Sequence, residues 1–124
     1  GEVTENNLTV SSYSDTYIKI QNAKYEFPIC IVANNIFQWK DKNYLNLSLQ
    51  ILNDLYEKSK TITDVGKAEV ILVGLSTGKI NKLLSLKNQC MKAKLPFEVM
   101  KHDAACRTIN ILSMEGRKII AILI

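Results

Sequence analysis

The sequence has few of the residues that most often build metal sites and disulfide scaffolds. Its 124 residues include one histidine, His102, and three cysteines, which are Cys30, Cys90 and Cys106. The cysteines are far apart and form no Cys-x-x-Cys pair. This argues against a zinc ribbon or a disulfide scaffold and for a reducing compartment. We therefore expect no metal and no other cofactor.

Long apolar runs, leader patterns and repeats are also lacking. No stretch of about eighteen apolar residues is present, so the sequence predicts no membrane span. Neither a secretory signal nor an arginine-rich leader is visible, and we expect a cytoplasmic bacterial protein, or one of the mitochondrial matrix if a leader has been removed. The net charge of +4 comes from dispersed lysines. It favours acidic partners or an anionic membrane surface, and the absence of a basic stripe with interleaved aromatics argues against nucleic acid.

The apolar content is enough for one core. With 47% apolar residues, 124 residues support a single domain. Residues 1–16 are polar and show no sustained period, so we expect a mobile leader that contributes at most a short edge strand near Leu8 and Val10. One α/β domain over residues 17–124 follows.

The first half of this domain predicts a hairpin and a helix. Residues 17–20 and 25–33 predict two paired strands, and Pro28 pushes the second toward an edge or an irregular start because proline lacks an amide proton. The only tryptophan, Trp39, is expected to plug one end of the core, with a binding role as the alternative because aromatic residues anchor interfaces. An amphipathic helix is predicted over residues 45–58, with its start left open between Leu45 and Ser48.

The second half alternates strand and helix, which predicts an α/β unit. The predicted elements are a strand over 69–75, a helix over 80–94, a strand over 97–100, a helix from Asp103 to a stop at Gly116, and a strand over 118–124. Because the last strand is almost entirely apolar, we place it inside a sheet that is covered on both faces. Glu115 and Arg117 flank Gly116 and are expected to fasten that turn.

The loop from Gly74 to Lys79 is a candidate anion site. Three residues separate Gly74 from Gly78 and Ile80 follows Lys79, so the loop matches neither a phosphate loop nor a dinucleotide loop. A helix amino terminus can nevertheless attract an anion. The candidate ligand residues at this loop and at the next helix start are Gly74, Thr77, Gly78, His102, Asp103 and Arg107.

The last part of the chain carries a specific set of spaced positions. They are Ala104, Ala105, Cys106, Arg107, Thr108, Asn110, Leu112, Glu115, Gly116, Arg117, Ala121, Leu123 and Ile124. The set resembles the terminal signature of mitochondrial complex I assembly factor 3 and its bacterial and archaeal relatives, a family mostly without assigned activity. Weaker resemblance extends back to about Tyr17. Lys101, His102 and Asp103 replace the family's usual Asp-Thr-Gly, and Ile109 stands where an aromatic is usual.

This resemblance implies a three-layer domain, with a central mixed sheet flanked by helices and an extra layer formed by the amino-terminal hairpin. It also implies a non-enzymatic role in protein contacts, with respiratory complex subunits or another assembly factor as partners. Peripheral membrane association and a homo-oligomer remain open. A small-molecule or anion binder, with or without enzymatic activity, is the alternative.

The helix after Asp103 predicts where such a partner would bind. Its outer arc mixes polar and apolar groups, as interface centres do, and comprises Arg107, Asn110, Ile111 and Met114. In the alternative interpretation, the amino-terminal strands cover this arc. A thiol at a helix start next to a histidine is a possible nucleophile. However, Cys106 lies at the margin of the core arc and no third group orients His102, so we expect no catalytic residue.

Overall fold

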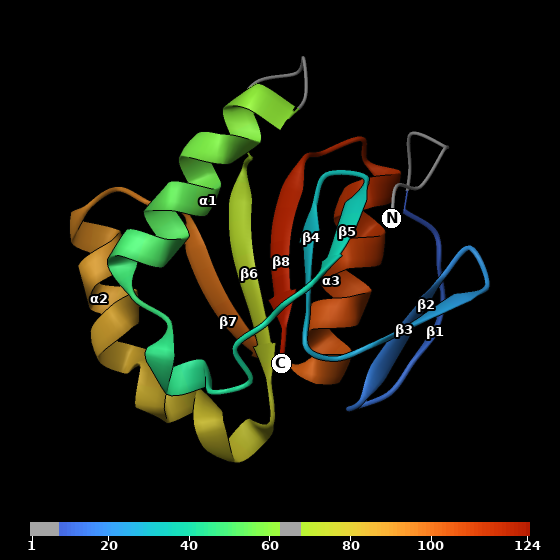
Figure 1. The fold of residues 1–124 in the computed structure, drawn as a ribbon, viewed down its shortest axis with the longest axis horizontal. Coiled ribbons are helices and arrows are strands. Elements are labelled where there is room, and N and C mark those ends of the chain that lie inside the picture. The colour runs from blue at the N-terminus through green and yellow to red at the C-terminus, as the bar shows by residue number, and fades with distance from the viewer. Residues whose placement is uncertain (1–7, 63–67) are drawn as a thin grey trace.

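A mixed sheet of five strands forms the centre of the protein in a computed structural model that describes residues 8–62 and 68–124. The strand order is β5 (Asn35–Gln38), β4 (Ile29–Val32), β8 (Ile119–Leu123), β6 (Val70–Leu75) and β7 (Phe97–Lys101) (Figure 1). Strand β4 runs antiparallel to β5 and β8, whereas β6 runs parallel to β8 and β7. The predicted α/β architecture with a mixed sheet is confirmed.

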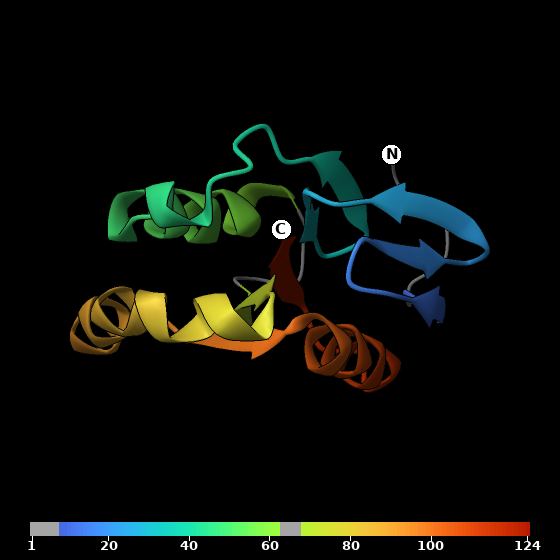
Figure 2. The same ribbon diagram turned by 90° about the horizontal axis from the view of Figure 1, so that it is seen from below.

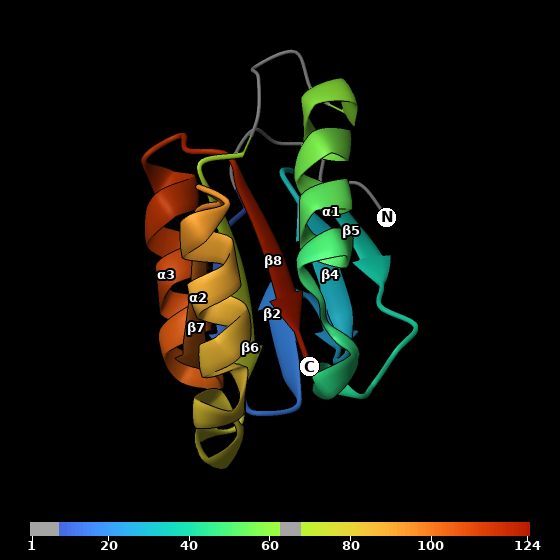
Figure 3. The same ribbon diagram turned by 90° about the vertical axis from the view of Figure 1, so that its left-hand side faces the viewer.

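Two different layers cover the two faces of this sheet. Helices α1 (Leu49–Ile62) and α2 (Leu84–Lys92) lie on one face. Helix α3 (His102–Met114) lies on the other, together with a small antiparallel sheet of β1 (Val10–Tyr13), β2 (Tyr17–Ile20) and β3 (Ala23–Glu26). Figure 2 shows the three layers edge on, and Figure 3 looks onto the face that α1 and α2 cover.

The last strand shows why both faces need a cover. All five residues of β8 are buried. Ile120 and Ile122 join the core beneath α1 and α2, whereas Ile119, Ala121 and Leu123 join the core beneath α3 and the small sheet. The period of two along a strand therefore divides one apolar run between two cores, as the sequence predicted.

The predicted strand over residues 25–33 is wrong as a single element. It is two strands, β3 and β4, which belong to different sheets. The break falls at Phe27 and Pro28, because proline cannot donate to a strand ladder. The predicted hairpin is present as β2 and β3, and its turn residues Gln21 and Asn22 adopt positive φ values of 51° and 69°. A second hairpin, β4 and β5, belongs to the central sheet.

Helix boundaries differ from the predicted ones. The first helix runs from Leu49 to Ile62 and follows a short 3₁₀ turn, η1 (Tyr44–Asn46). The helix expected over residues 80–94 consists of a 3₁₀ segment, η2 (Thr77–Leu83), and α2. The predicted polar leader covers residues 1–16, and its residues 8–16 contain the short edge strand β1, which the sequence allowed for. Residues 1–7 and 63–67 lie outside the described residues.

The turn after α3 forms as expected. Gly116 has a positive φ of 72°, the left-handed conformation that commonly ends a helix. Arg117 Nε lies 2.6 Å from Glu69 Oε2, and its Nη1 lies 3.6 Å from Glu115 Oε1. These contacts hold the turn against the start of β6.

Candidate functional site

A polar crevice of about 470 Å³ opens at the carboxyl ends of β6 and β7. It is lined by Tyr13, Ser14, Asp15, Leu75, Ser76, Thr77, Lys101, His102 and Asp103. The structure therefore brings together the two segments that the sequence named as ligand candidates, the loop after β6 and the start of α3. The turn between β1 and β2 adds a third wall that the sequence did not indicate.

The order of the strands explains why a crevice forms here. Strand β6 lies between β7 and β8. The chain leaves β6 through η2 and α2 on one face of the sheet, and it leaves β7 through α3 on the opposite face. In open α/β sheets, connections that diverge in this way leave a crevice outside the carboxyl ends of the strands, where ligands bind.

The two candidate glycines do not line this crevice. Gly74 lies inside β6, and a Cβ placed on it would lie 2.6 Å from Leu123 Cδ2 and 3.0 Å from Ala105 Cβ. A glycine at this position therefore serves close packing of α3 on the sheet. Gly78 lies in η2 and has open space around it. Of the three candidates in this loop, only Thr77 lines the crevice.

The imidazole of His102 is held from two sides. Its Nε2 lies 2.6 Å from the backbone oxygen of Ile124, so this nitrogen carries the proton and donates it to that acceptor. The ring also stacks on Phe27, with 5.1 Å between centroids. His102 is buried with 6% of its surface exposed. Its position is therefore set by the fold, and it forms a buried part of the crevice wall.

Asp103 and Arg107 form an ion pair across one helical turn. Arg107 Nη1 lies 3.3 Å from Asp103 Oδ2 and 3.4 Å from the Tyr13 hydroxyl. The helix starts one residue earlier than expected, at His102, and Asp103 accepts the amide of Ala104 from within the first turn. Asp103 lines the crevice, whereas Arg107 is not among its lining residues.

The thiol of Cys106 is part of the core. The residue is fully buried, and burial raises the pKa of its thiol to about 12, with a further contribution from Asp103 that Arg107 opposes. Such a thiol stays protonated at neutral pH and is a poor nucleophile. Within the part of the chain that the structure describes, no group of three His, Cys, Asp or Glu side chains could hold a metal ion.

The outer arc of α3 is divided between two environments. Asn110 Oδ1 accepts the amide of Val10 at 3.0 Å, so β1 covers one edge of the arc. Ile111 and Met114 remain exposed, with 56% and 68% of their surfaces open. The alternative interpretation, in which an amino-terminal strand covers this arc, therefore holds for Asn110 but not for the two apolar residues.

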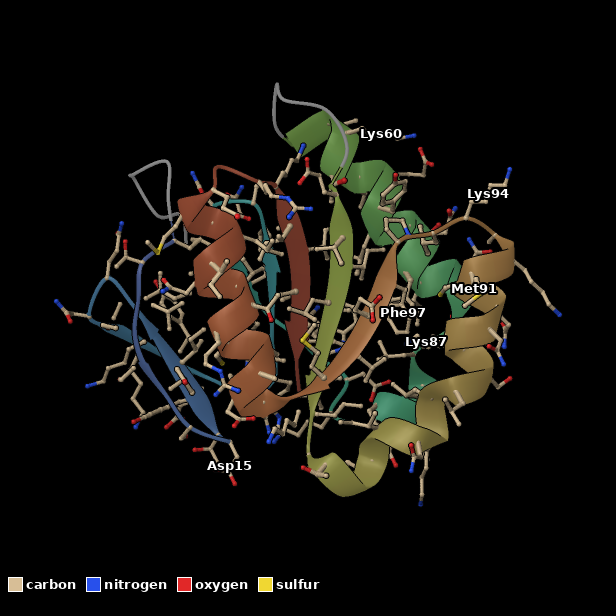
Figure 4. All side chains as sticks on the ribbon, turned by 180° about the vertical axis from the view of Figure 1, so that it is seen from behind. Asp15, Lys60, Lys87, Met91, Lys94 and Phe97 are labelled. Carbon is tan, nitrogen blue, oxygen red and sulfur yellow. The ribbon has the colours of Figure 1, made fainter. Side chains whose placement is uncertain are left out.

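The η2 and α2 segment forms a basic surface, although the lysines look dispersed over the sequence as a whole. Residues 70–97 contain five lysines and no aspartate or glutamate, a bias that a count of charges by segment would have found. Leu84 and Met91 are exposed on the same helix, with 57% and 67% of their surfaces open. Figure 4 shows Lys87, Met91 and Lys94 on this side of the molecule. The η2 and α2 segment therefore carries both positive charge and apolar side chains outward.

Comparison with known proteins shows the fold and the family. The chain is 28% identical over 104 residues to a Francisella tularensis protein called 13 kDa major membrane protein, covering 82% of this chain and 77% of that protein. No helix within residues 8–62 and 68–124 has the length and apolar character needed to cross a membrane.

Solved structures from other bacteria have the same fold. A crystal structure of a Bordetella parapertussis protein matches with a TM-score of 0.67 at 22% identity, covering 98% of both chains. A solution structure from Bordetella pertussis, described as a Mth938-like domain, matches with a TM-score of 0.63 at 20% identity and covers all of this chain and 89% of that one. The family described as protein of unknown function DUF498/DUF598 matches residues 10–124. This protein is a member of that family.

Proposed function

We propose that this protein is a non-enzymatic interaction domain that binds a protein partner through the outer face of α3. The observation that carries the proposal is the exposure of Ile111 and Met114, three residues apart on one helix face. Arg107 lies on the same side and is exposed. Methionine and arginine are enriched at interfaces, and clustered apolar side chains on a surface mark contact sites.

The proposed partner is a subunit of a respiratory complex or another assembly factor. This part of the proposal rests on the sequence resemblance to complex I assembly factor 3, which is densest between Ala105 and Arg117 on and after α3. Burial of Cys106 and the fixed ring of His102 support a role without catalysis.

We also propose that the protein binds its partner at a membrane surface. The relative from Francisella tularensis is called a major membrane protein, and the basic surface of α2 could rest on anionic lipid beside the exposed Leu84 and Met91. Sedimentation with vesicles tests this, because a double change of Lys87 and Lys92 to glutamate should release the protein from anionic but not neutral vesicles. Equal binding to both vesicle types would contradict membrane association through charge.

Affinity capture tests the protein contact. The tagged protein is recovered from gently solubilised membranes and from cytosol, in parallel with the variant Ile111→Asp, Met114→Asp. We expect respiratory complex subunits or an assembly factor with the native chain and none with the variant, while both melt at nearly the same temperature. Leu45→Asp is the matched control, because Leu45 is an exposed leucine outside α3, with 55% of its surface open. Loss of capture by the control alone would contradict the proposed surface.

The crevice at the carboxyl ends of β6 and β7 favours a second candidate, a small anionic ligand. Its volume lies in the range of small-molecule sites, and Ser76, Thr77 and Lys101 offer donors to an anion. Amide chemical shifts recorded while inorganic phosphate or a small carboxylate is added test this candidate. We expect saturable shifts at Ser76 to Thr77 and at Lys101 to Asp103, and uniform small shifts over the surface would contradict it.

A further inference from the structure

A second cavity, of about 440 Å³, lies on the face of the central sheet that α1 and α2 cover. It is bounded by β4 and β5, by the chain that follows β5, and by α1. Its lining residues are Cys30, Val32, Phe37, Gln38, Trp39, Lys40, Asp41, Leu55 and Lys58. We call it the Trp39 groove. None of its residues belongs to the crevice or to the outer face of α3.

The floor and walls of the Trp39 groove are apolar. Cys30 and Val32 belong to the core beneath α1 and α2 and form the floor. Trp39 and Leu55 are partly buried against the same core, and Phe37 has 48% of its surface exposed. Large aromatic side chains left open around a concave apolar floor are the usual lining of a small-molecule pocket.

The charged residues of the groove favour a negative ligand group. Lys40 follows β5 and Lys58 lies on α1, so the two come from different walls of the groove, and both are exposed. Asp41 also lines it, but its Oδ2 accepts the Asn46 amide group at 2.8 Å and its Oδ1 accepts the backbone amide of Asn43 at 2.9 Å. The acid is thus held by its own loop, while both ammonium groups remain available to an incoming anion.

We propose that the Trp39 groove binds an amphiphilic carboxylate, with an acyl chain or a similar apolar body against Trp39 and Leu55 and the carboxylate near Lys40 and Lys58. Burial of each methylene adds favourable transfer energy, so affinity should rise about tenfold for every two methylenes added, until the groove is full. The positive groups should make a carboxylate bind more tightly than the alcohol of equal length. A cationic amphiphile should bind least tightly.

Trp39 is the only tryptophan, so its fluorescence reports directly on the groove. The probes are octanoate, decanoate, decanol and decylammonium, each added below the concentration at which it aggregates. We expect a saturable blue shift with the two carboxylates and tighter binding of decanoate than of octanoate. Absence of a saturable change with any probe would overturn the proposal, and so would equal affinities for decanoate and decylammonium.

Variants distinguish the contribution of the lysines from that of the apolar wall of the groove. Lys40→Gln, Lys58→Gln should weaken decanoate binding by about three- to tenfold and leave decanol binding unchanged, because exposed charges contribute modestly. Lys42→Gln is the matched control, since this nearby lysine does not line the groove. Phe37→Ser changes an exposed side chain, and it should weaken both ligands.

Two further results would count against a carboxylate in the groove. If Trp39 fluorescence shifts with protein concentration alone and sedimentation shows a dimer, a second copy of this chain fills the groove. If Phe37→Ser leaves decanoate binding intact, the probe binds elsewhere. Either result overturns the proposal.

Discussion

The two faces of the central sheet are closed to different degrees. On the α3 face, small residues let the helix approach: Gly74 has no side chain, Ala105 lies over it, and both Ala105 and Cys106 are fully buried. Strand β1 then bonds to the helix through Asn110, which closes the layer from the side. On the α1 and α2 face, large side chains meet, and they leave a cavity beside Trp39 and Leu55.

This difference explains where the two proposed binding surfaces lie. Where small residues permit close contact, the inner side of α3 is filled and only its outer side can meet a partner. Where aromatic and branched side chains meet between α1 and β5, a concave apolar surface remains open. The tightly packed face therefore leaves only the outer side of α3 open, and the more open face leaves a cavity.

The largest expected effect is a loss of stability, and it should differ between two leucines of α1. Leu52 is fully buried and Leu55 lines the Trp39 groove. Leu52→Ala should lower the free energy of unfolding by about 2–5 kcal/mol, because it removes buried contacts and leaves a cavity. Leu55→Ala should cost clearly less, since its site is already open. Urea denaturation measures both, and equal costs would mean that the groove is closed in solution.

A smaller effect is expected from glycine on the tight face. Gly74→Ala should lower the free energy of unfolding by about 1–3 kcal/mol, because the new methyl group overlaps Leu123 and Ala105. Gly78→Ala is the control, with open space around the added carbon. It should leave stability unchanged or raise it by up to about 1 kcal/mol. Comparable losses in the two variants would contradict close packing at Gly74.

The thiol of Cys106, on the buried side of α3, provides a chemical test of the same packing. Cys106→Ala should cost about 1 kcal/mol, since it removes one buried sulfur atom. Because burial raises the pKa of the Cys106 thiol to about 12, iodoacetamide at pH 7 should leave it unmodified in the native protein and alkylate it in urea. Peptide mass spectrometry reads both states. Rapid native alkylation of Cys106 would show that the α3 face opens.

The smallest effect is expected at the turn after α3. Arg117 and Glu69 form a short ion pair, but about half of each side chain is exposed. Arg117→Gln should therefore lower the free energy of unfolding by only about 0.2–1 kcal/mol, and added salt should shrink the difference. A double-mutant cycle with Glu69→Gln isolates the pair. A coupling above that range would mean that surface charges, not core packing, hold this end of α3.

Local patterns in the sequence were sufficient to predict an element where a residue type has one main structural use. The apolar run before Ile124 indicated a strand buried on both sides, and Gly116 indicated a helix stop. Pro28 marked an irregularity correctly, but its consequence was larger than expected. The strand was divided between two sheets, because the partner of each half comes from a distant part of the chain.

The candidate site divides in the same way. The loop after β6 and the start of α3 were both identified, and Thr77, His102 and Asp103 meet in one crevice. Tyr13 and its neighbours were missed because their place depends on how the small sheet packs against α3. Gly74 was assigned to a loop because a sequence does not show which distant atoms approach a glycine.

By itself, the sequence determined the order of strands and helices in the second half, the double burial of β8 and the excess of lysine. These depend on spacing and composition, which act within a few residues. Only the tertiary structure decided which face each helix covers, and hence where a crevice and a groove remain. Those features depend on how closely segments far apart in the chain can pack, and that distance is set by the size of residues such as Gly74 and Ala105 on one face and Trp39 and Leu55 on the other.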